Sequence, residues 1–599
     1  MPPLSQSRLL PPGGVARLLL AAGLGVLSLL PLLSCRRGGK PGVLVIAIEQ
    51  APRGFDPRFS TANSQSAHVM QLVYDTLMVK DAHFDLVPSL AGSFVQAEDQ
   101  KTFTFHIRSG VRFHNGRPLT SADVKYTFDS ILDPATKSPI RGAIDKIAVI
   151  DTPDPLTVVF RMREPSYTFL GNLPAIGIIP NGSGSELTSS PMGSGPYRFV
   201  SYSEDGGLKL DSNAAYWGGA PNIPHIQVEL IQDNSTRQAA LMSGEVDLAY
   251  NAQFDPETIR ALAGNRRLKV SISAGANIAY LGVNVTAGPL SNRNVRQAIA
   301  FSINRREIIH RLLRDQAREA DSVLPPEQWA YDPGFVYNYD PEKAKQLLDG
   351  AGFPDPDGEG PQPRFSLSLM TSTNQLSRNI GAILQDQLRR VGIKLELASF
   401  ESATFFDKLA KGQFELYYLI GVGGNQNTDI FEYTYHSRYH NDSFNEAIAR
   451  LGTAKNEAEI LTLSGRIATI LGARDYCANP EVDSLAERAK TAEAADEKKS
   501  LYLKIAGLLT DPGGANRSRF CDPEVDRWIE DADRVIGRDQ KQPLFSQIQK
   551  RLSLDLPQIY LWHPATVVVA RSRVRDIQVE PSGSWYFITR LTLDDTRGK

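Results

Sequence analysis

Residues 102–124 of this chain read TFTFHIRSGVRFHNGRPLTSADV, and they carry a strand, a turn and a helix in immediate succession. The first six residues alternate between polar and apolar types, which is the period of a half-buried β-strand. The Gly-Arg-Pro at 116–118 indicates a turn. Thr120 is placed to cap the following helix, and Asp123 completes a capping box in which Asp replaces Glu. We therefore expect a strand at the start of this stretch and a helix from its end to Leu132.

Strand and helix patterns are interleaved along the rest of the chain. Residues 43–48 form a continuous apolar run, typical of a buried strand. Residues 294–313 and 340–351 have the period of amphipathic helices. The helical pattern at 379–391 is followed at once by a strand-like segment at 393–397. This interleaving favours α/β layers.

Length and composition limit the kind of protein further. The chain has 599 residues, whereas single hydrophobic cores stop growing at about 250–300, so two or three domains are expected. Hydrophobic residues make up 42% and charged residues 22%, which is ordinary for a globular protein. The formal charge of −2 argues against a nucleic-acid scaffold. Three cysteines are too few for a disulfide framework or a cysteine-rich metal site.

The N-terminus resembles an export signal that ends in a lipidation site. Two arginines precede an apolar run of 16 residues at 18–33, shorter than the roughly 20 that a membrane-spanning helix needs. The run ends in Leu32-Leu33-Ser34-Cys35, which resembles the bacterial lipobox, where a small residue precedes the lipidated cysteine. We expect residues 1–34 to be a signal peptide, Cys35 to carry the lipid, and the rest to lie outside a membrane. The alternatives are a plain signal peptide and a membrane-anchoring helix with an incidental cysteine.

A series of sequence blocks follows in order along the chain: FDP at 55–57, YDTL at 74–77, residues 86–94 leading into 103–124, GSGPY at 193–197, and residues 213–221, 240–247, 294–300 and 339–348. In content and order they resemble the bacterial extracellular solute-binding proteins of the oligopeptide, dipeptide and nickel cluster, which supply ABC importers. The similarity covers nearly all of the chain after the signal. Most of these residues are also explained as scaffolding, such as turns and helix caps.

The resemblance implies a particular α/β architecture. This is the two-lobed periplasmic-binding-protein fold of type II with an extra domain, and its ligand cleft lies between the lobes. Domain interfaces are where concave binding sites usually form. The implied boundaries are 43–75, 191–285 and 563–599 for a discontinuous first lobe, 76–190 for the extra domain and 286–562 for the second lobe.

The resemblance also implies a function and its partners. The chain would be an extracytoplasmic lipoprotein that delivers an oligopeptide or dipeptide to the permease subunits of an ABC transporter. The membrane is a partner through the lipid anchor, a monomer is expected, and neither nucleic acid nor a cofactor is expected. The alternatives are a sugar, a nickel chelate or another small solute as ligand on the same fold, and a secreted hydrolase.

The stretch 421–431, GVGGNQNTDIF, lies where peptide-binding members of the family usually carry an aromatic residue and then a carboxylate that holds the peptide's α-amino group. Here Val422 replaces the aromatic residue, and Asn425 or its neighbour falls at the acidic position. A neutral side chain binds an ammonium group less well, so an uncharged ligand or a peptide held through its backbone is the alternative. The expected ligand contacts are Gly423, Asn425, Asp429, Tyr280 and Phe55. The alternative roles are a helix cap for Asp429 and core packing for Tyr280 and Phe55.

Sequence motifs of common enzyme classes were sought in the whole chain. It contains no nucleophile elbow, phosphate-binding loop, His-Glu-x-x-His or Cys-x-x-Cys. His436 and His440 are four residues apart, the spacing that places two metal ligands on one helix face, but Asp442 is their only nearby carboxylate. We expect neither catalysis nor a metal site.

The region 440–555 contains an internal repeat. Asn-Pro-Glu-Val-Asp at 479–483 and Asp-Pro-Glu-Val-Asp at 522–526 stand 43 residues apart, and apolar positions after them match at the same offset. Each unit is predicted to be a capped helix, a turn and a second helix. Cys477 and Cys521 precede the two copies, and they either form a disulfide in an oxidising compartment or remain two thiols.

Overall fold

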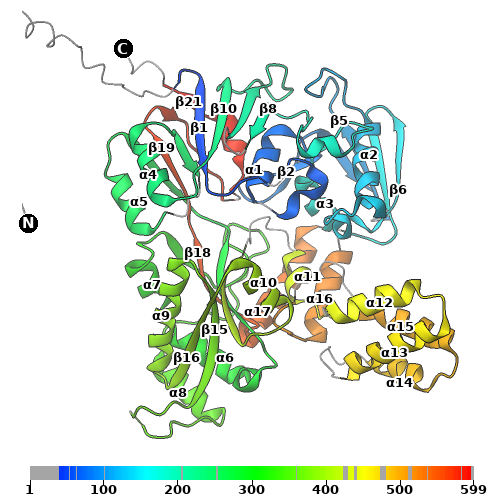
Figure 1. The fold of residues 1–599 in the computed structure, drawn as a ribbon, viewed down its shortest axis with the longest axis vertical. Coiled ribbons are helices and arrows are strands. Elements are labelled where there is room, and N and C mark those ends of the chain that lie inside the picture. Colours follow the sequence, from blue (N-terminus) through cyan, green and yellow to red (C-terminus); the bar gives the residue numbers. More distant parts are fainter. Residues whose placement is uncertain are drawn as a thin grey trace, which may run out of the picture.

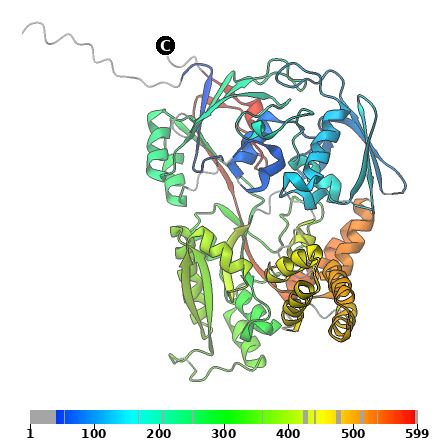
Figure 2. The ribbon, with the colours of Figure 1, turned by 45° about the vertical axis from the view of Figure 1, so that its right-hand side comes forward.

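The fold has two stacked lobes, seen one above the other in Figure 1, with a further domain beside the upper lobe and a group of helices beside the lower one. A second view, Figure 2, shows the same arrangement turned about the vertical axis. The structure is a computed structural model that describes residues 40–594 except 53, 63, 100, 167, 204–206, 251–253, 359, 422–428, 438–441, 473–479, 510–515, 536 and 582.

The first lobe is built on a seven-stranded sheet. In spatial order its strands are β12 (Leu268–Ser273), β19 (Thr566–Arg571), β11 (Leu248–Tyr250), β1 (Val43–Ile48), β10 (His225–Leu230), β9 (Gly207–Ser212) and β8 (Tyr197–Ser203). Alternate side chains of β1 enter two cores. Leu44 and Ile46 share a core with α1 (Ser64–Val73), while Val45 and Ala47 share one with α4 (Asn234–Ser243) and α5 (Pro256–Ala263). The apolar run predicted at 43–48 is therefore confirmed as a buried strand.

The second lobe has a six-stranded sheet between two helical layers. In spatial order its strands are β14 (Ala317–Glu319), β18 (Gln558–Pro564), β13 (Ile278–Val283), β17 (Leu416–Gly421), β15 (Phe365–Ser372) and β16 (Ile393–Phe400). One face packs on α6 (Arg293–Ser302), α8 (Pro341–Gly350) and α9 (Gln375–Arg389). The other packs on α10 (Ser402–Ala410), α11 (Asp429–Tyr435), α16 (Pro523–Arg534) and α17 (Arg538–Asp555).

The extra domain contains a four-stranded antiparallel sheet in the order β4 (Ala91–Gln96), β5 (Thr102–Ile107), β7 (Thr157–Met162), β6 (Ile147–Asp154), with α2 (Ser121–Leu132) packed on it. The strand and helix predicted within 102–132 are both confirmed. The capping box is present, since the backbone N–H of Thr120 donates to Asp123 Oδ2 at 2.8 Å. This cap starts the helix that covers the sheet.

Three helical hairpins occupy the repeat region. They are α12 (Asp442–Thr453) with α13 (Glu457–Gly472), α14 (Pro480–Thr491) with α15 (Ala495–Leu509), and α16 with α17. The first two pairs share a core of their own and project from the second lobe (Figure 1). Val482 and Val525 are equivalent in the repeat and both are buried, as are Ile505 and Ile548. Cys521 is disulfide-bonded, while Cys477 lies outside the described residues, so their pairing stays a prediction.

The lobes are connected by a ribbon of two antiparallel strands. The chain passes from β12 into β13 and returns from β18 into β19, and these strands pair with each other in both sheets. Gly275 lies at the crossing, where a Cβ atom would stand 1.9 Å from the carbonyl oxygen of Pro564. Only glycine allows this close approach of the two backbones.

The points where the ribbon crosses between the lobes differ from the expected lobe boundaries. The sequence assigns residues up to 285 to the first lobe and begins its return at 563, but β13 and β18 both pair in the second lobe's sheet. The crossings lie at 274–277 and at Ala565, because continuous strands run on each side of these points. The sequence interrupts the strand pattern at both points, with Ala-Gly-Ala-Asn at 274–277 and Pro-Ala at 564–565, but these short breaks do not by themselves indicate a change of lobe.

A buried carboxylate ties segments of the first lobe together at the point where the chain enters the extra domain. Asp75 accepts hydrogen bonds from Ser194 Oγ at 2.8 Å, Trp217 Nε1 at 3.0 Å and Tyr216 Oη at 3.0 Å. Gly193 is required beside it, because a Cβ there would lie 1.9 Å from the carbonyl oxygen of Val73. Burial raises the pKa of Asp75 to about 6, although its three donors favour the ionised form.

Substituting Asp75 with Asn tests this junction. An amide has one acceptor oxygen and a donor NH₂ group, so at least one buried donor loses its partner, at about 2–4 kcal/mol of unfolding free energy. We expect a lower urea midpoint for Asp75→Asn at pH 7. The matched substitution Asp151→Asn, at an exposed carboxylate paired with Arg161, should leave the midpoint unchanged. Equal midpoints for the wild type and Asp75→Asn would contradict the role of this carboxylate.

Candidate functional site

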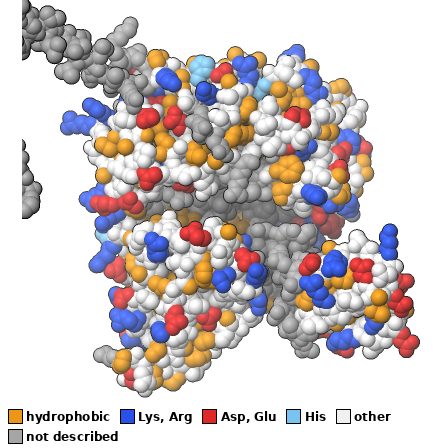
Figure 3. Space-filling view, viewed as in Figure 1, with side chains coloured by type: hydrophobic (Ala, Val, Ile, Leu, Met, Phe, Trp, Pro, Cys, Tyr) orange, Lys and Arg blue, Asp and Glu red, His pale blue; other side chains and the backbone are white. Residues whose placement is uncertain are grey.

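A groove separates the two lobes on the face shown in Figure 3. Its hinge side is bridged by the ion pair between Arg314 Nε and Glu257 Oε2 at 3.0 Å. The far side is bridged by Lys146 Nζ and Asp533 Oδ2 at 2.7 Å, from the extra domain to α16. The groove between the bridges is the concave region where domain interfaces usually bind ligands.

The predicted ligand segment begins where β17 ends. Gly421 is the last residue of β17, Gly423 and Asn425 lie outside the described residues, and Asp429 is the first residue of α11. A Cβ on Gly421 would stand 3.1 Å from the Tyr280 ring, so Tyr280 lies directly beside the start of this segment. The structure thus brings Tyr280 to the segment predicted with it.

Tyr280 belongs to a cluster of buried tyrosines in the second lobe. Its side chain is 6% exposed, and its ring meets that of Tyr417 edge-on at 5.8 Å. Nearby, Tyr435 Oη donates to Gln558 Oε1 at 2.7 Å, and its oxygen lies 2.7 Å from that of Tyr560. Burial raises the pKa of both Tyr435 and Tyr560, so they remain protonated at neutral pH and hold α11 against β18. Sequence reasoning missed Tyr417, Tyr435 and Tyr560, which no local spacing connects.

Phe55 lies in the core rather than at the groove. It is 1% exposed and packs against the rings of Phe199 and Tyr202, with centroids at 5.6 and 5.4 Å. The first lobe's sheet needs an apolar cover at this point, and the Phe-Asp-Pro turn supplies it. Core packing, the alternative role for Phe55, is what the structure shows.

The metal-binding hypothesis was tested on the described part of the chain. Within it, no group of three or more His, Cys, Asp or Glu side chains is placed to hold a metal ion. His436 is buried beside Glu530 of α16, with 3.5 Å between His436 Nε2 and Glu530 Oε1, and His440 lies outside the described residues.

Among the described helices, none is both long and apolar enough to span a membrane.

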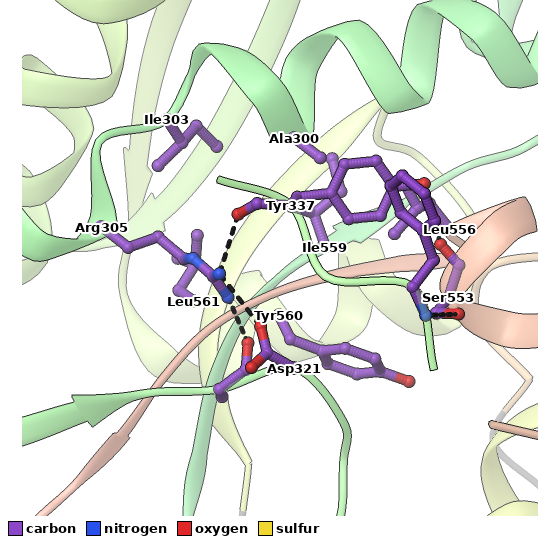
Figure 4. Close-up of a pocket in the computed structure, with 12 residues that line it drawn as sticks. Ala300, Ile303, Arg305, Asp321, Tyr337, Ser553, Leu556, Ile559, Tyr560 and Leu561 are labelled. Carbon is purple, nitrogen blue, oxygen red and sulfur yellow. Dashed lines mark hydrogen bonds and ion pairs between the residues drawn. The ribbon is translucent and has the colours of Figure 1, made fainter. Parts of the chain in front are cut away.

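A small cavity inside the second lobe is too small for a solute. Figure 4 shows that Arg305, Asp321, Tyr337 and Tyr560 are among its lining residues. Its volume is about 20 Å³, enough for about one water molecule. The Arg305 guanidinium donates to the Tyr337 carbonyl at 2.9 Å and pairs with Asp321 at 3.0 Å, so its charge is satisfied within the lobe.

Comparison with known proteins places the chain in one family. The family model described as bacterial extracellular solute-binding proteins, family 5 Middle, matches residues 85–443. Di/tripeptide-binding protein 1 of Pseudomonas aeruginosa is 24% identical, over 90% of this chain and 92% of the relative. Di/tripeptide-binding protein 2 of the same organism is 26% identical, over 93% and 96%.

Two solved structures have the same fold. The oligopeptide-binding protein AppA from Bacillus subtilis, in complex with a nonapeptide, superposes with a TM-score of 0.68 at 20% identity, covering 93% of this chain and 99% of AppA. NikZ from Campylobacter jejuni, in complex with Ni(L-His), superposes with a TM-score of 0.69 at 20% identity, covering 92% of this chain and all of NikZ.

A histidine at the hinge makes folding sensitive to acid. His563 is 1% exposed, and its Nδ1–H donates to the carbonyl of Asn277 across the ribbon at 3.0 Å. Burial lowers its pKa to about 4, with Arg318 adding to the effect, while Asn277 and Glu327 oppose it. As the pH falls, this histidine is therefore protonated at about pH 6.5 in the unfolded chain but only at about pH 4 in the folded chain.

The stability from this group is present above pH 6.5 and is lost as the pH falls towards 4. At pH 5 the loss amounts to about 2 kcal/mol. We expect urea unfolding at pH 7 and pH 5 to show a smaller pH-dependent loss for His563→Gln than for the wild type. An identical loss in both proteins would contradict a neutral, buried His563.

Proposed function

Since the chain belongs to the bacterial extracellular solute-binding proteins of family 5, we propose that it captures short peptides in the groove between its lobes and delivers them to the permease of an ABC importer. The observation that carries this proposal is the nearly full-length match to two di/tripeptide-binding relatives. The ribbon supports it physically, because two strands crossing between separate cores allow one lobe to rotate on the other.

We propose domain bounds that follow the two large sheets, whose lobes form the two walls of the groove. The first lobe comprises 43–75, 191–273 and 566–594. The extra domain comprises 76–190, and the second lobe comprises 278–564 with the helical hairpins. A ligand that contacts both walls favours the closed arrangement, because its binding energy is realised only there. Ligand binding and closure are therefore one equilibrium, and no chemical step is required of the protein.

The ligand anchor is proposed to lie between β17 and α11. Asp429 would hold the peptide's α-amino group, Asn425 and Gly423 would contact its backbone, and Tyr280 would contact the ligand from below. Asp429 begins α11, which the Tyr435 hydrogen bonds hold in place.

A non-peptide ligand is the second candidate. NikZ, with a TM-score of 0.69, is in complex with Ni(L-His), and a structure of AgaA from A. tumefacien with a TM-score of 0.67 is in complex with agropinic acid. The same fold therefore holds ligands of different chemistry. The dependence of binding on a free amine separates the two candidates.

We further propose that the protein is exported and held at the cell envelope by a lipid on Cys35. The family is described as extracellular, which agrees with an export signal at the N-terminus. Delivery to a permease needs only one copy of this chain near the membrane, so we assign a monomer.

Calorimetric titration of Ala-Ala-Ala tests the anchor. Wild type should bind this tripeptide, and both N-acetylation of the peptide and Asp429→Asn should weaken binding about tenfold to a hundredfold, the range for one charged hydrogen bond. In Asp429→Asn, acetylation should have no further effect. The control Asp407→Asn removes an exposed carboxylate of α10 and should bind as the wild type does. Equal affinity of Asp429→Asn and wild type, with the fold intact, would place the anchor elsewhere.

Labelling with radioactive palmitate tests the lipid anchor. The wild type expressed in a bacterial host should incorporate the label, and Cys35→Ala should lose it because the thioether has no sulfur to form on. Cys477→Ala serves as the control and should remain labelled. Undiminished labelling of Cys35→Ala would rule out lipidation at this residue.

A further inference from the structure

The far side of the groove is bridged by a charged contact between separate bodies. Lys146 immediately precedes β6 of the extra domain, and Asp533 lies in the last turn of α16 in the second lobe. Their side chains are 27% and 14% exposed, and the Nζ–Oδ2 distance is 2.7 Å. A charged hydrogen bond that is partly withdrawn from water is stronger than a fully solvated surface pair.

A second pair lies next to the first. Arg538, the first residue of α17, pairs with Asp85 of the extra domain, and its guanidinium lies 5.2 Å from the centre of the Trp329 ring. Figures 1 and 2 both show α16 reaching the underside of the extra domain, well away from the strands β18 and β19 that cross between the lobes. Both pairs must therefore separate when the lobes rotate apart about the ribbon.

Each partner of the first pair has a second charge within its own body. Lys146 also lies 3.4 Å from Glu164 of the extra domain. Asp533 lies in the field of Lys541, a buried residue of α17 that donates to the Ala532 carbonyl. Opening the groove therefore leaves neither charge isolated, which keeps the separation reversible.

We propose that Lys146–Asp533, with Asp85–Arg538 beside it, is an electrostatic latch that stabilises the closed groove and so sets the affinity for ligand without touching it. This inference rests on the proposed closure of the lobes around a solute. The latch also adjoins the ligand segment, because Glu432 of α11 lies in the field of Lys146. Closure therefore brings Lys146 towards two helices of the second lobe at once.

The expected effect follows from the closed fraction of the protein. Apparent affinity falls in proportion to the fraction of molecules in the binding-competent state. Removing one partly exposed pair should lower affinity about threefold to tenfold. High salt should have a similar effect on the wild type, because the Debye length falls from about 30 Å at 0.01 M to about 3 Å at 1 M.

Small-angle scattering of the ligand-free protein tests the latch directly. We would compare the wild type, Lys146→Ala, Asp533→Ala and the double variant that carries both substitutions, each at 20 mM and 500 mM NaCl. The matched control is Lys125→Ala, because Lys125 pairs only with Asp129 on its own helix among the contacts of the described residues. The wild type and the control should expand with salt, and the single variants should be expanded at both concentrations. The double variant should be no more expanded than either single variant, because both substitutions remove the same contact.

The same proteins are then titrated with Ala-Ala-Ala. The single variants should bind about threefold to tenfold more weakly than the wild type and the control, and the double variant should bind no more weakly than either single variant. Radii of gyration that are equal for all the proteins and unaffected by salt would overturn the latch. If no protein binds peptide while the radii still follow the charges, the proposed ligand is wrong and the latch stands.

Discussion

The close contact of two crossing strands is the constraint on which the rest of the structure depends. β12 leads into β13 and β18 leads into β19. β12 pairs with β19 in the first lobe's sheet and β13 pairs with β18 in the second lobe's sheet, and Gly275 allows the two backbones to meet at Pro564. Each lobe closes a separate core on its own side of this ribbon. The lobes can therefore rotate without breaking a core, and the energy of closure falls on the surfaces that meet across the groove.

The other long-range contacts acquire a role from this geometry. The backbone N–H groups of Ile178 and His114 in the extra domain donate to the carbonyls of Asp75 and Gly193 in the first lobe, so the extra domain moves with that lobe. The Tyr435 hydrogen bonds tie α11 to β18 in the second lobe. The pair Lys146–Asp533 then joins the two bodies at the side away from the ribbon. A protein that binds a solute reversibly needs a hinge, two rigid lobes and a weak charged contact between the lobes.

Local patterns predicted most of the elements, although the helix expected at 294–313 is two helices, α6 and α7 (Arg305–Arg311), separated at Asn304, whose side chain caps α7. Long-range contacts were not predicted. Alternation at 102–107 and the cap at Thr120 gave the strand and helix, because both signals lie within one element. The expected lobe boundary at 285 differs from the arrangement of the sheets, because β13 pairs in the second lobe's sheet. Phe55 was assigned both to the ligand site and, as the alternative, to the core. The sequence around a single aromatic residue does not show whether its ring faces a cleft or the hydrophobic core. Lys146 and Asp533 are 387 residues apart, and no spacing relates them.

In the proposed function, this chain holds a short peptide and releases it unchanged. Native mass spectrometry of the protein purified from its own host measures this directly, because any bound solute adds its mass to the intact protein. The account predicts added masses that, after mild denaturation, fragment as intact short peptides with free amino termini. A chemically altered ligand, or a bound solute that contains no peptide, would contradict it.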